Sequence, residues 1–354
     1  MLAIWITAGI GVLIGFISFT RKSKVEFKNR HVLLALCSTG LSHGPWVHGQ
    51  CIAQLLNKQL VTGGSEGIGL SVAIRLAKKG ANISLLSRTD AKLKAAAATL
   101  RANMEESQRV TTVACDISAS YQKVKDAIDQ ACSELGPVDA LINCAGTSVA
   151  SAFENTAVED FERLMRLNYH GSVFATRAVI DGMKSRRSGT IVFTSSQAGQ
   201  IGLYGYTAYS ASKFALRGLA ECLRMEVKPY GVNVSIAFPP DTDTPGYKEE
   251  IERGVPEETL IISKSSGLYT SDFVADNILK GITNGDFFIP VGFEGNVLTI
   301  ITAGMAPAAS VIDGIIQIIL LPILRISAFF YQFQFGRIVS QCMKKKNLGQ
   351  NKRD

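Results

Sequence analysis

The chain has 354 residues, a length that one large α/β catalytic unit with shorter appendages would account for. Apolar residues make up 47% of it and charged residues 19%, so a large core can form. The net charge of +7 could suggest a nucleic acid partner, but Lys and Arg gather beside apolar segments, at 21–30 and 337–353. We therefore expect these basic residues to contact a membrane surface, and we expect no nucleic acid partner.

The first segment, residues 1–20, carries no charged side chain, and five basic residues follow it between Arg21 and Arg30. About 20 apolar residues suffice to cross a bilayer, whereas a cleaved signal peptide has its positive charge before a shorter apolar run. The pattern therefore predicts a retained transmembrane anchor at 1–20. Because the basic residues lie on its C-terminal side, we expect the catalytic domain to face the cytosol.

Residues 21–59 are predicted to be a basic linker followed by an atypical insert. Only Leu60 and Val61 cleanly precede the Gly-rich turn at Thr62, and residues 57–59 suit a buried parallel strand poorly, which puts the first strand in doubt. Three interpretations of His31–Gln59 stay open: a metal site, a functional insertion, or a gene-model artefact such as a translated intron. Its His and Cys residues match no zinc spacing, so we predict no metal.

From residue 60 to about 290 the sequence indicates a catalytic domain. Short apolar runs typical of strands alternate with helix-type segments in its first two thirds. The runs are Asn82–Ser87, Arg109–Cys115, Ala140–Cys144, Thr190–Thr194 and Asn233–Phe238. Strands separated by helices form βαβ units, so we predict an α/β fold with a Rossmann-type doubly wound parallel sheet.

The first turn of this domain is rich in glycine, from Thr62 to Gly69, and precedes a helical segment. Glycines allow a tight turn and a close approach of the backbone to a pyrophosphate, whose charge the helix N-terminus then meets. This pattern predicts a dinucleotide site. Its expected contacts are Gly63, Ser65, Glu66, Gly67, Ile68 and Gly69.

The second strand is expected to end at Arg88, where NAD-binding folds have an acidic residue that holds the ribose 2′-hydroxyl. An arginine suits the 2′-phosphate of NADPH, although the nearby Asp90 leaves NAD as an alternative cofactor. Lys92 is a weaker second contact. Asp116, after the third strand, is expected beside the adenine, and Asn143, at the end of the fourth, beside the cofactor.

The reaction centre is predicted around Tyr209 and Lys213, which open a helix at positions i and i+4 and so share one face. An ammonium near a phenol lowers its pKa from about 10 and brings a proton donor closer to the working pH. The alternative is a buried tyrosine beside an unrelated lysine.

Three further residues are expected to assist. Ser195 and Ser196 end a strand, and one of them would hydrogen-bond the substrate oxygen as charge develops on it. The spacing of thirteen residues to Tyr209 favours Ser196, with Ser195 left open. Asn168 either holds a water that relays protons to Lys213 or packs and caps a helix.

The C-terminal part is again apolar and is expected to form membrane-associated helices over 291–336. Gly314–Leu324 and Ile326–Gly336 flank a single Arg325, and Pro307 and Pro322 would kink a helix. A hairpin or an interfacial pair of helices is as compatible with this pattern as two spans. Residues 337–354 are expected to be a basic cytosolic tail.

In combination, these motifs resemble the short-chain dehydrogenase/reductase family over residues 60 to about 290. The matching elements are Thr62–Gly69, Asn143–Gly146, Asn168, Ser195 with Ser196, and Tyr209–Lys213, in that order. The resemblance implies an NADPH-dependent oxidoreductase in which Tyr209 donates the proton, Lys213 holds the ribose and Thr244 contacts the cofactor. In the family's Pro-Gly-x-x-x-Thr element, Pro240 replaces the glycine.

Within that family the chain looks like the members that reduce a long-chain sphingoid ketone at the endoplasmic reticulum membrane. Pro239–Gly246 is the most distinctive matching stretch. The segment Gly246–Gly267 is then either a lid over an apolar substrate or a variable surface loop. A steroid or retinoid dehydrogenase and a non-catalytic lipid-binding relative are the alternatives, and a homo-oligomer is left open.

Overall fold

The computed structural model of this chain describes residues 58–264 and 267–350. The anchor predicted at 1–20 and most of the linker and insert lie outside the described residues. The interpretations of the insert therefore stay predictions.

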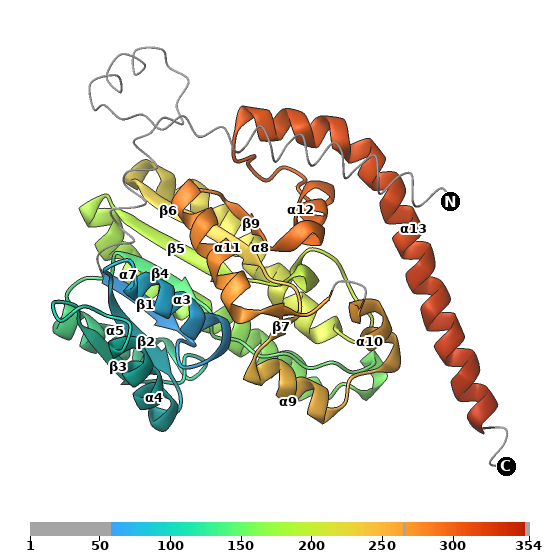
Figure 1. The fold of residues 1–354 in the computed structure, drawn as a ribbon, viewed down its shortest axis with the longest axis horizontal. Helices are drawn as coiled ribbons and strands as arrows, with labels where there is room; N and C mark the ends of the chain where they lie inside the picture. The colour runs from blue at the N-terminus through green and yellow to red at the C-terminus, as the bar shows by residue number, and fades with distance from the viewer. Residues whose placement is uncertain (1–57, 265–266, 351–354) are drawn as a thin grey trace. The chain divides into compact units, whose positions relative to one another are not determined.

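The core of the molecule is a parallel sheet of seven strands in the order β3-β2-β1-β4-β5-β6-β9 (Figure 1). Its strands are β1 (Lys58–Thr62), β2 (Asn82–Ser87), β3 (Val110–Ala114), β4 (Ala140–Asn143), β5 (Gly189–Thr194), β6 (Val232–Phe238) and β9 (Phe288–Pro290). The predicted doubly wound fold and its five apolar strands are confirmed. Two short strands, β7 (Thr242–Asp243) and β8 (Tyr269–Thr270), form a separate pair.

Helices cover both faces of the sheet because its strands carry apolar side chains on both faces. On β1, Leu60 packs into the core shared with α5, α7 and α8, and Val61 into the core shared with α3, α4 and α11. These helices are α3 (Gly67–Ala77), α4 (Asp90–Arg101), α5 (Tyr121–Leu135), α7 (Gly171–Arg186), α8 (Thr207–Val227) and α11 (Ser271–Asn284). The others are α6 (Val158–Leu164), α9 (Pro245–Arg253), α10 (Glu257–Lys264), α12 (Gly292–Ile301) and α13 (Val311–Gln350).

The doubt about the first strand was wrong, because β1 forms and begins at Lys58. It pairs with β2 and with β4 in register, with Val61 opposite Leu85 on one side and Ile142 on the other. Ladder hydrogen bonds use the main chain, so a polar side chain at position 59 does not prevent pairing. The Lys58 main-chain N–H also donates to the Asp139 carboxylate, at 3.2 Å.

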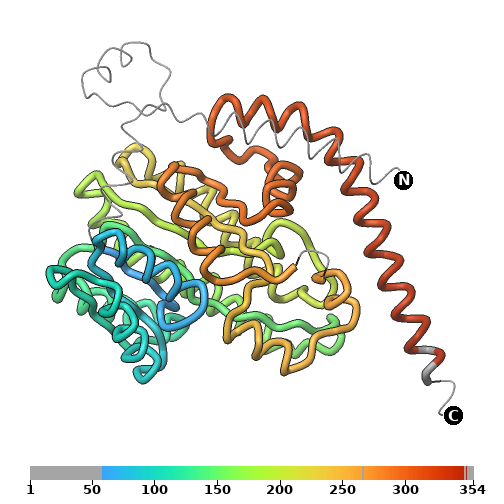
Figure 2. Tube along the Cα trace, in the orientation of Figure 1, coloured from blue at the N-terminus to red at the C-terminus, as the bar shows by residue number. Residues whose placement is uncertain are grey.

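The C-terminal region, for which a hairpin, an interfacial pair of helices and two spans were left open, forms the two helices α12 and α13. After α12, one helix of 40 residues, α13, runs from Val311 to Gln350 with Pro322 inside it. Figure 2 shows the trace of α13 bending along its length, as an internal proline causes. The Arg325 guanidinium lies 5.2 Å from the centre of the Phe329 ring, one turn further on, so its charge has a partner within the helix.

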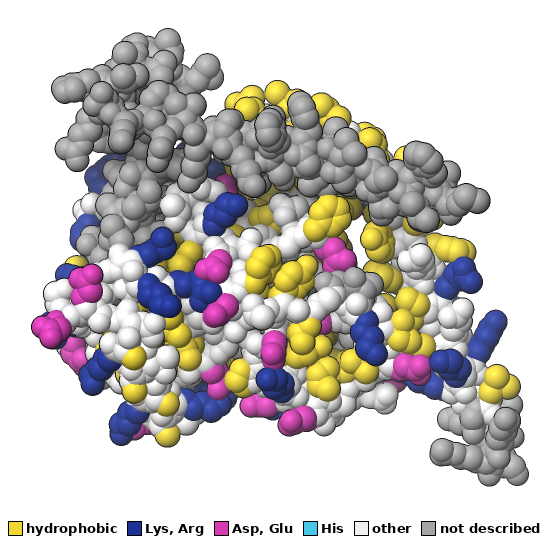
Figure 3. All heavy atoms as spheres, viewed as in Figure 1, with side chains coloured by type: hydrophobic (Ala, Val, Ile, Leu, Met, Phe, Trp, Pro, Cys, Tyr) yellow, Lys and Arg dark blue, Asp and Glu magenta, His cyan; other side chains and the backbone are white. Residues whose placement is uncertain are grey.

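α13 carries many exposed apolar side chains, which Figure 3 shows in yellow along its course. By length and composition, Val311–Lys346 is the one candidate membrane span within the described ranges. The helix is therefore compatible with a membrane anchor. Basic residues follow near its C-terminal end, including Lys345 and Lys346.

The strand order reverses between β1 and β4, because β2 follows β1 on one side and β5 follows β4 on the other. In open parallel sheets the crevice beyond the carboxyl ends of such strands is where ligands bind. The Gly-rich turn follows β1, and Asn143 ends β4.

Candidate active site

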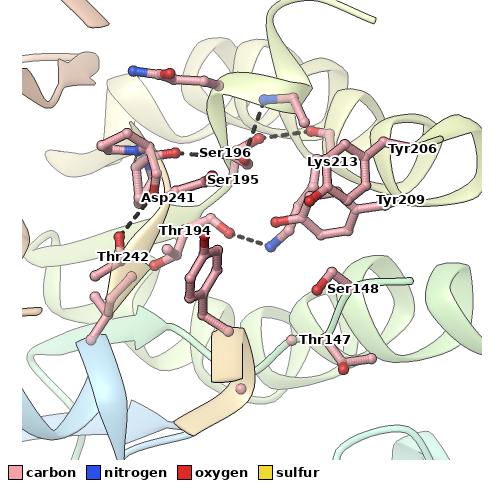
Figure 4. Close-up of a pocket in the computed structure, with 18 of the residues that line it drawn as sticks. Thr147, Ser148, Thr194, Ser195, Ser196, Tyr206, Tyr209, Lys213, Asp241 and Thr242 are labelled. Atoms are coloured by element: carbon pink, nitrogen blue, oxygen red, sulfur yellow. Dashed lines mark hydrogen bonds between the residues drawn. The ribbon is translucent and has the colours of Figure 1, made fainter. Parts of the chain in front are cut away.

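A cavity of about 760 Å³ lies at this crevice. The Gly-rich turn, the ends of β2 to β6, the start of α8 and residues of α9, α12 and α13 line it. Figure 4 shows Ser196, Tyr209 and Lys213 around it. The residues predicted for cofactor and catalysis thus largely converge on one cavity.

The glycines of the first turn are required by its shape. Gly63 has a φ of +65°, and a Cβ there would lie 2.7 Å from the Ala145 Cα. A Cβ on Gly69 would collide with the Gly63 carbonyl oxygen. The turn therefore leaves main-chain surface open at the start of α3, and this cradle fits a dinucleotide pyrophosphate.

The polar residues after β2 and β3 also line the cavity. Ser65 donates to the Ser87 hydroxyl at 2.8 Å, and Arg88 beside them is exposed. Arg88 forms no ion pair within the part of the chain that the structure describes, so its charge is available to a ligand phosphate. The Asp116 carboxylate accepts from the Ser118 main chain at 2.9 Å.

Two of the residues predicted to contact the cofactor do not line the cavity. Lys92 does not line it, although its ammonium pairs with the Glu66 carboxylate, at 2.8 Å. Asn143 is buried beneath it, with its side-chain nitrogen 3.5 Å from the Thr176 hydroxyl. Glu66, Thr244 and the other predicted contacts do line it.

Tyr209 and Lys213 lie together, as their spacing predicted, with the lysine Nζ 5.7 Å from the centre of the tyrosine ring. The expected lowering of the tyrosine pKa is wrong for this structure. Burial raises the pKa of Tyr209 above its ordinary value, and only a hydrogen bond from Ser196 opposes that rise. Burial also lowers the pKa of Lys213 to about 8, because a desolvated ammonium is costly. The phenol is therefore protonated at neutral pH.

The two serines that the sequence left as alternatives have different surroundings. The Ser195 hydroxyl is buried and donates to the Lys213 carbonyl oxygen at 2.9 Å. The Ser196 hydroxyl faces Tyr209, accepts from the Ala198 main chain at 3.2 Å and lies 3.5 Å from the Pro239 carbonyl oxygen. Ser196 is thus the serine whose hydroxyl is open to a ligand beside Tyr209.

Asn168 does not line the cavity and is fully buried in a π-helix, Met165–His170, between α6 and α7. Its side chain bonds the Thr147 main chain twice, at 2.9 and 3.0 Å, and the Ser212 hydroxyl at 2.9 Å. This geometry fits the packing interpretation, since Asn168 ties the loop after β4 to α8.

Four residues near Tyr209 were not predicted. Tyr206 packs on it with ring centres 5.4 Å apart, and Ser148, Asp241 and Glu250 line the same end of the cavity. Burial raises the pKa of both carboxyl groups. Asp241 sits in the distinctive Pro239–Gly246 stretch and could have been selected from it, but no sequence pattern marks Glu250.

The part of the cavity that α12 and α13 line is largely apolar, although Glu294, Thr302, Arg325 and Gln332 line it too. Its side chains come from α12 and α13, which the sequence did not connect with the active site. The apolar ones are Phe293, Val297, Leu298, Ile301, Ala328, Tyr331 and Phe335. The cavity therefore joins a polar end at Tyr209 to an apolar end at the candidate membrane helix.

A family model for short chain dehydrogenases matches residues 57–253. The chain belongs to the short-chain dehydrogenase family. It is 48% identical over 288 residues to 3-ketodihydrosphingosine reductase from Bos taurus, covering 81% of this chain and 86% of that one. It is 47% identical to 3-dehydrosphinganine reductase from Danio rerio over 285 residues, or 80% of this chain and 86% of that protein.

Solved short-chain dehydrogenases have the same fold. NAD⁺-bound xylitol dehydrogenase superposes with a TM-score of 0.59 at 25% identity, covering 64% of this chain and 92% of that one. This short-chain dehydrogenase is therefore an oxidoreductase that acts on a ketone or alcohol with a nicotinamide dinucleotide. The glycine cradle described above fits that cofactor.

Proposed function

We propose that this short-chain dehydrogenase reduces the C3 ketone of 3-dehydrosphinganine to the alcohol of sphinganine, with NADPH. Support comes from relatives that carry this activity in their names and match over most of their length at 47–48% identity. The alternative of a non-catalytic relative depended on a disrupted first strand, and β1 is intact. No observation favours a steroid or retinoid.

The observation that carries the proposal is the two-ended cavity. A proton donor with its hydrogen-bonding serine lies at one end, and apolar side chains of α12 and α13 lie at the other. A long-chain ketone needs both, because its carbonyl reacts while its hydrocarbon tail is stabilised by burial away from water. Residues of α9 and α10 line the cavity too, which supports the lid interpretation of Gly246–Gly267.

In the proposed reaction the bound cofactor supplies a hydride to the carbonyl carbon. Ser196 donates a hydrogen bond to the ketone oxygen and so stabilises the negative charge that develops on it. Tyr209 then transfers its proton to that oxygen, and its raised pKa keeps the proton in place until the substrate arrives. The Lys213 ammonium, beside the phenol, stabilises the phenolate that remains.

The choice of NADPH over NADH is attributed to Arg88, which lies at the ribose end of the cavity without an acidic partner in the described ranges. A guanidinium can bind a phosphate through two parallel hydrogen bonds. Gly63, Gly67 and Thr244 would hold the pyrophosphate and the nicotinamide side. An acidic residue in place of Arg88 would instead favour NADH.

We further propose that the protein works at the endoplasmic reticulum membrane with its catalytic domain in the cytosol. The apolar helix α13 and the basic residues that follow the apolar run at 1–20 support this location. Protease treatment of sealed microsomes tests the orientation, because a cytosolic domain is cleaved without detergent. Protection of the catalytic domain would overturn it.

The activity is tested by supplying the detergent-purified full chain with NADPH and 3-dehydrosphinganine. We expect NADPH absorbance to fall and sphinganine to appear by mass spectrometry, with slower turnover when NADH replaces NADPH. A panel of steroid and retinoid ketones runs in parallel. Turnover of a panel member without turnover of the sphingoid ketone would overturn the proposal.

A further inference from the structure

A carboxylate without a cationic partner faces the catalytic end of the cavity. Glu250, on α9, is only 8% exposed and lines the cavity. The Ser148 and Tyr206 hydroxyls hydrogen-bond its carboxylate, but its Oε1 has no partner within the described residues. An ionised carboxylate that is buried in this way is costly unless a cation or several donors compensate it. The arrangement therefore suggests that a ligand supplies the missing partner.

The surroundings of Glu250 are acidic. Asp241 lines the same end of the cavity, where the Ser263 hydroxyl donates to it. Neither carboxylate forms an ion pair with a described lysine or arginine, and Lys213 donates to the Thr194 carbonyl oxygen instead. This end of the cavity thus attracts a positive charge.

The acidic residues lie close to the reacting group. Tyr206 links Glu250 to the phenol, because its hydroxyl hydrogen-bonds the Glu250 carboxylate and its ring centre lies 5.4 Å from that of Tyr209. The charges of Glu250 and Asp241 also contribute to the raised pKa of Tyr209. Figure 4 shows Asp241 and Tyr209 around the same cavity. A substrate that presents its ketone to Tyr209 would therefore bring the neighbouring carbon toward these carboxylates.

The proposed substrate carries a cation at that position, because its amine is bonded to the carbon next to the ketone. An amine next to a carbonyl is a weaker base than lysine, but with a pKa of about 7.7–8.0, as for a peptide α-amino group, it is mostly protonated at neutral pH, and a nearby carboxylate favours that form. We propose that Glu250 binds the substrate ammonium and thereby selects long-chain 2-amino ketones over ketones without an amine. This inference rests on the proposed function and names the specificity residue of that same site. Asp241 adds negative potential without direct contact.

The test compares two substrates in the full chain and in Glu250→Gln, which keeps the shape and removes the charge. One is 3-dehydrosphinganine, and the other is its desamino analogue, with hydrogen in place of the amine. A hydrogen bond to a charged group is worth about 1.5–3 kcal/mol, so kcat/KM for the amino ketone should fall about 10- to 100-fold. For the desamino analogue it should stay nearly constant.

Inhibition by sphinganine and by its desamino alcohol provides a second measurement, which does not depend on turnover of the analogue. Glu250→Gln should weaken inhibition by sphinganine alone. The matched control is Glu249→Gln, the same change at an exposed position that pairs with Arg253, and it should alter neither compound. Unchanged NADPH binding would show that the variant folds.

Equal losses for the amino and desamino compounds would assign Glu250 a structural role and overturn the inference. No loss for either compound would overturn it as well. A failure of the proposed function looks different, because the unmodified chain would then not turn over 3-dehydrosphinganine at all.

Discussion

The Lys213 ammonium donates to the Thr194 carbonyl oxygen at 2.9 Å, which ties α8 to the carboxyl end of β5. The Ser195 hydroxyl makes the reciprocal link, to the Lys213 carbonyl oxygen at 2.9 Å. These two bonds fix the first turns of α8 against the sheet. Tyr209, one turn before Lys213, is held over the cavity as a result.

Tyr209→Phe removes the proton donor and keeps the ring. We expect kcat to fall by about 10²–10⁴-fold, the usual contribution of general acid catalysis, with NADPH binding retained. Stopped-flow measurement of NADPH oxidation and cofactor fluorescence check the two parts. Tyr230→Phe, at an exposed position, is the control and should keep full activity. Substantial turnover by Tyr209→Phe would contradict the assigned role.

Ser195→Ala and Ser196→Ala should have opposite consequences. Because Ser196 is expected to donate to the developing oxyanion, its loss should lower kcat about 10²–10³-fold with little change in stability. Loss of the buried Ser195 hydroxyl should cost about 1 kcal/mol of the free energy of unfolding and leave most of the activity. Steady-state kinetics and chemical denaturation separate the two. The reverse pattern would make Ser195 the catalytic serine.

Arg88→Ala should change the choice of cofactor. The loss of a charged contact to the 2′-phosphate should lower kcat/KM for NADPH about 10- to 100-fold, whereas the value for NADH should change little. Lys94→Ala removes an exposed charge that pairs with Asp90 and serves as the control. An equal fall in kcat/KM for both cofactors would show that Arg88 does not bind the 2′-phosphate.

Lys213→Met should abolish activity and remove a pH-dependent cost to stability, together with the hydrogen bond to Thr194, whose loss does not depend on pH. Burial lowers the pKa of Lys213 from 10.5 to about 8, so the unfolded chain holds its proton more tightly. Below pH 8 this protonation difference costs the folded state about 3 kcal/mol. The cost fades as the pH rises through 8 to 10.5, where the unfolded state loses its proton too.

The measurement is chemical denaturation of both proteins across this pH range. The free energy of unfolding of Lys213→Met, relative to that of the unmodified chain, should be highest below pH 8 and should fall as the pH rises to 10.5. Lys228→Met replaces an exposed lysine and should show no such trend. If the two free energies of unfolding differed by the same amount at all pH values, protonation of Lys213 would not cost the folded state free energy, and the prediction would be contradicted.

Local patterns were enough to predict five of the seven sheet strands and the placement of Tyr209 and Lys213 on one helix face. A buried parallel strand needs a short apolar run, and a shared helix face needs spacing of four residues, so both are visible without the fold. β9 was missed because its three residues, Phe288–Pro290, are too short to form a pattern.

Features that depend on distant segments could not be predicted. Glu250 reaches the site only because α9 folds over the cavity, and Lys92 stays outside the lining although it pairs with Glu66, which belongs to the lining. The pKa of Tyr209 also depends on enclosure by several elements, which outweighs the neighbouring lysine expected from spacing. Arg325 did not interrupt α13, because its partner, Phe329, lies within the same helix.

The attachment of α13 at both ends restricts how it can meet a bilayer. Near its start it packs with α12, and near its end Lys345 and Lys346 pair with Glu257 and Glu258 of α10, at 3.2 and 2.7 Å. Its 40 residues extend roughly 60 Å, about twice the hydrocarbon thickness. A helix held against one domain near both ends keeps those ends on the same side of a bilayer, so we expect it to lie along the membrane surface and not to cross it.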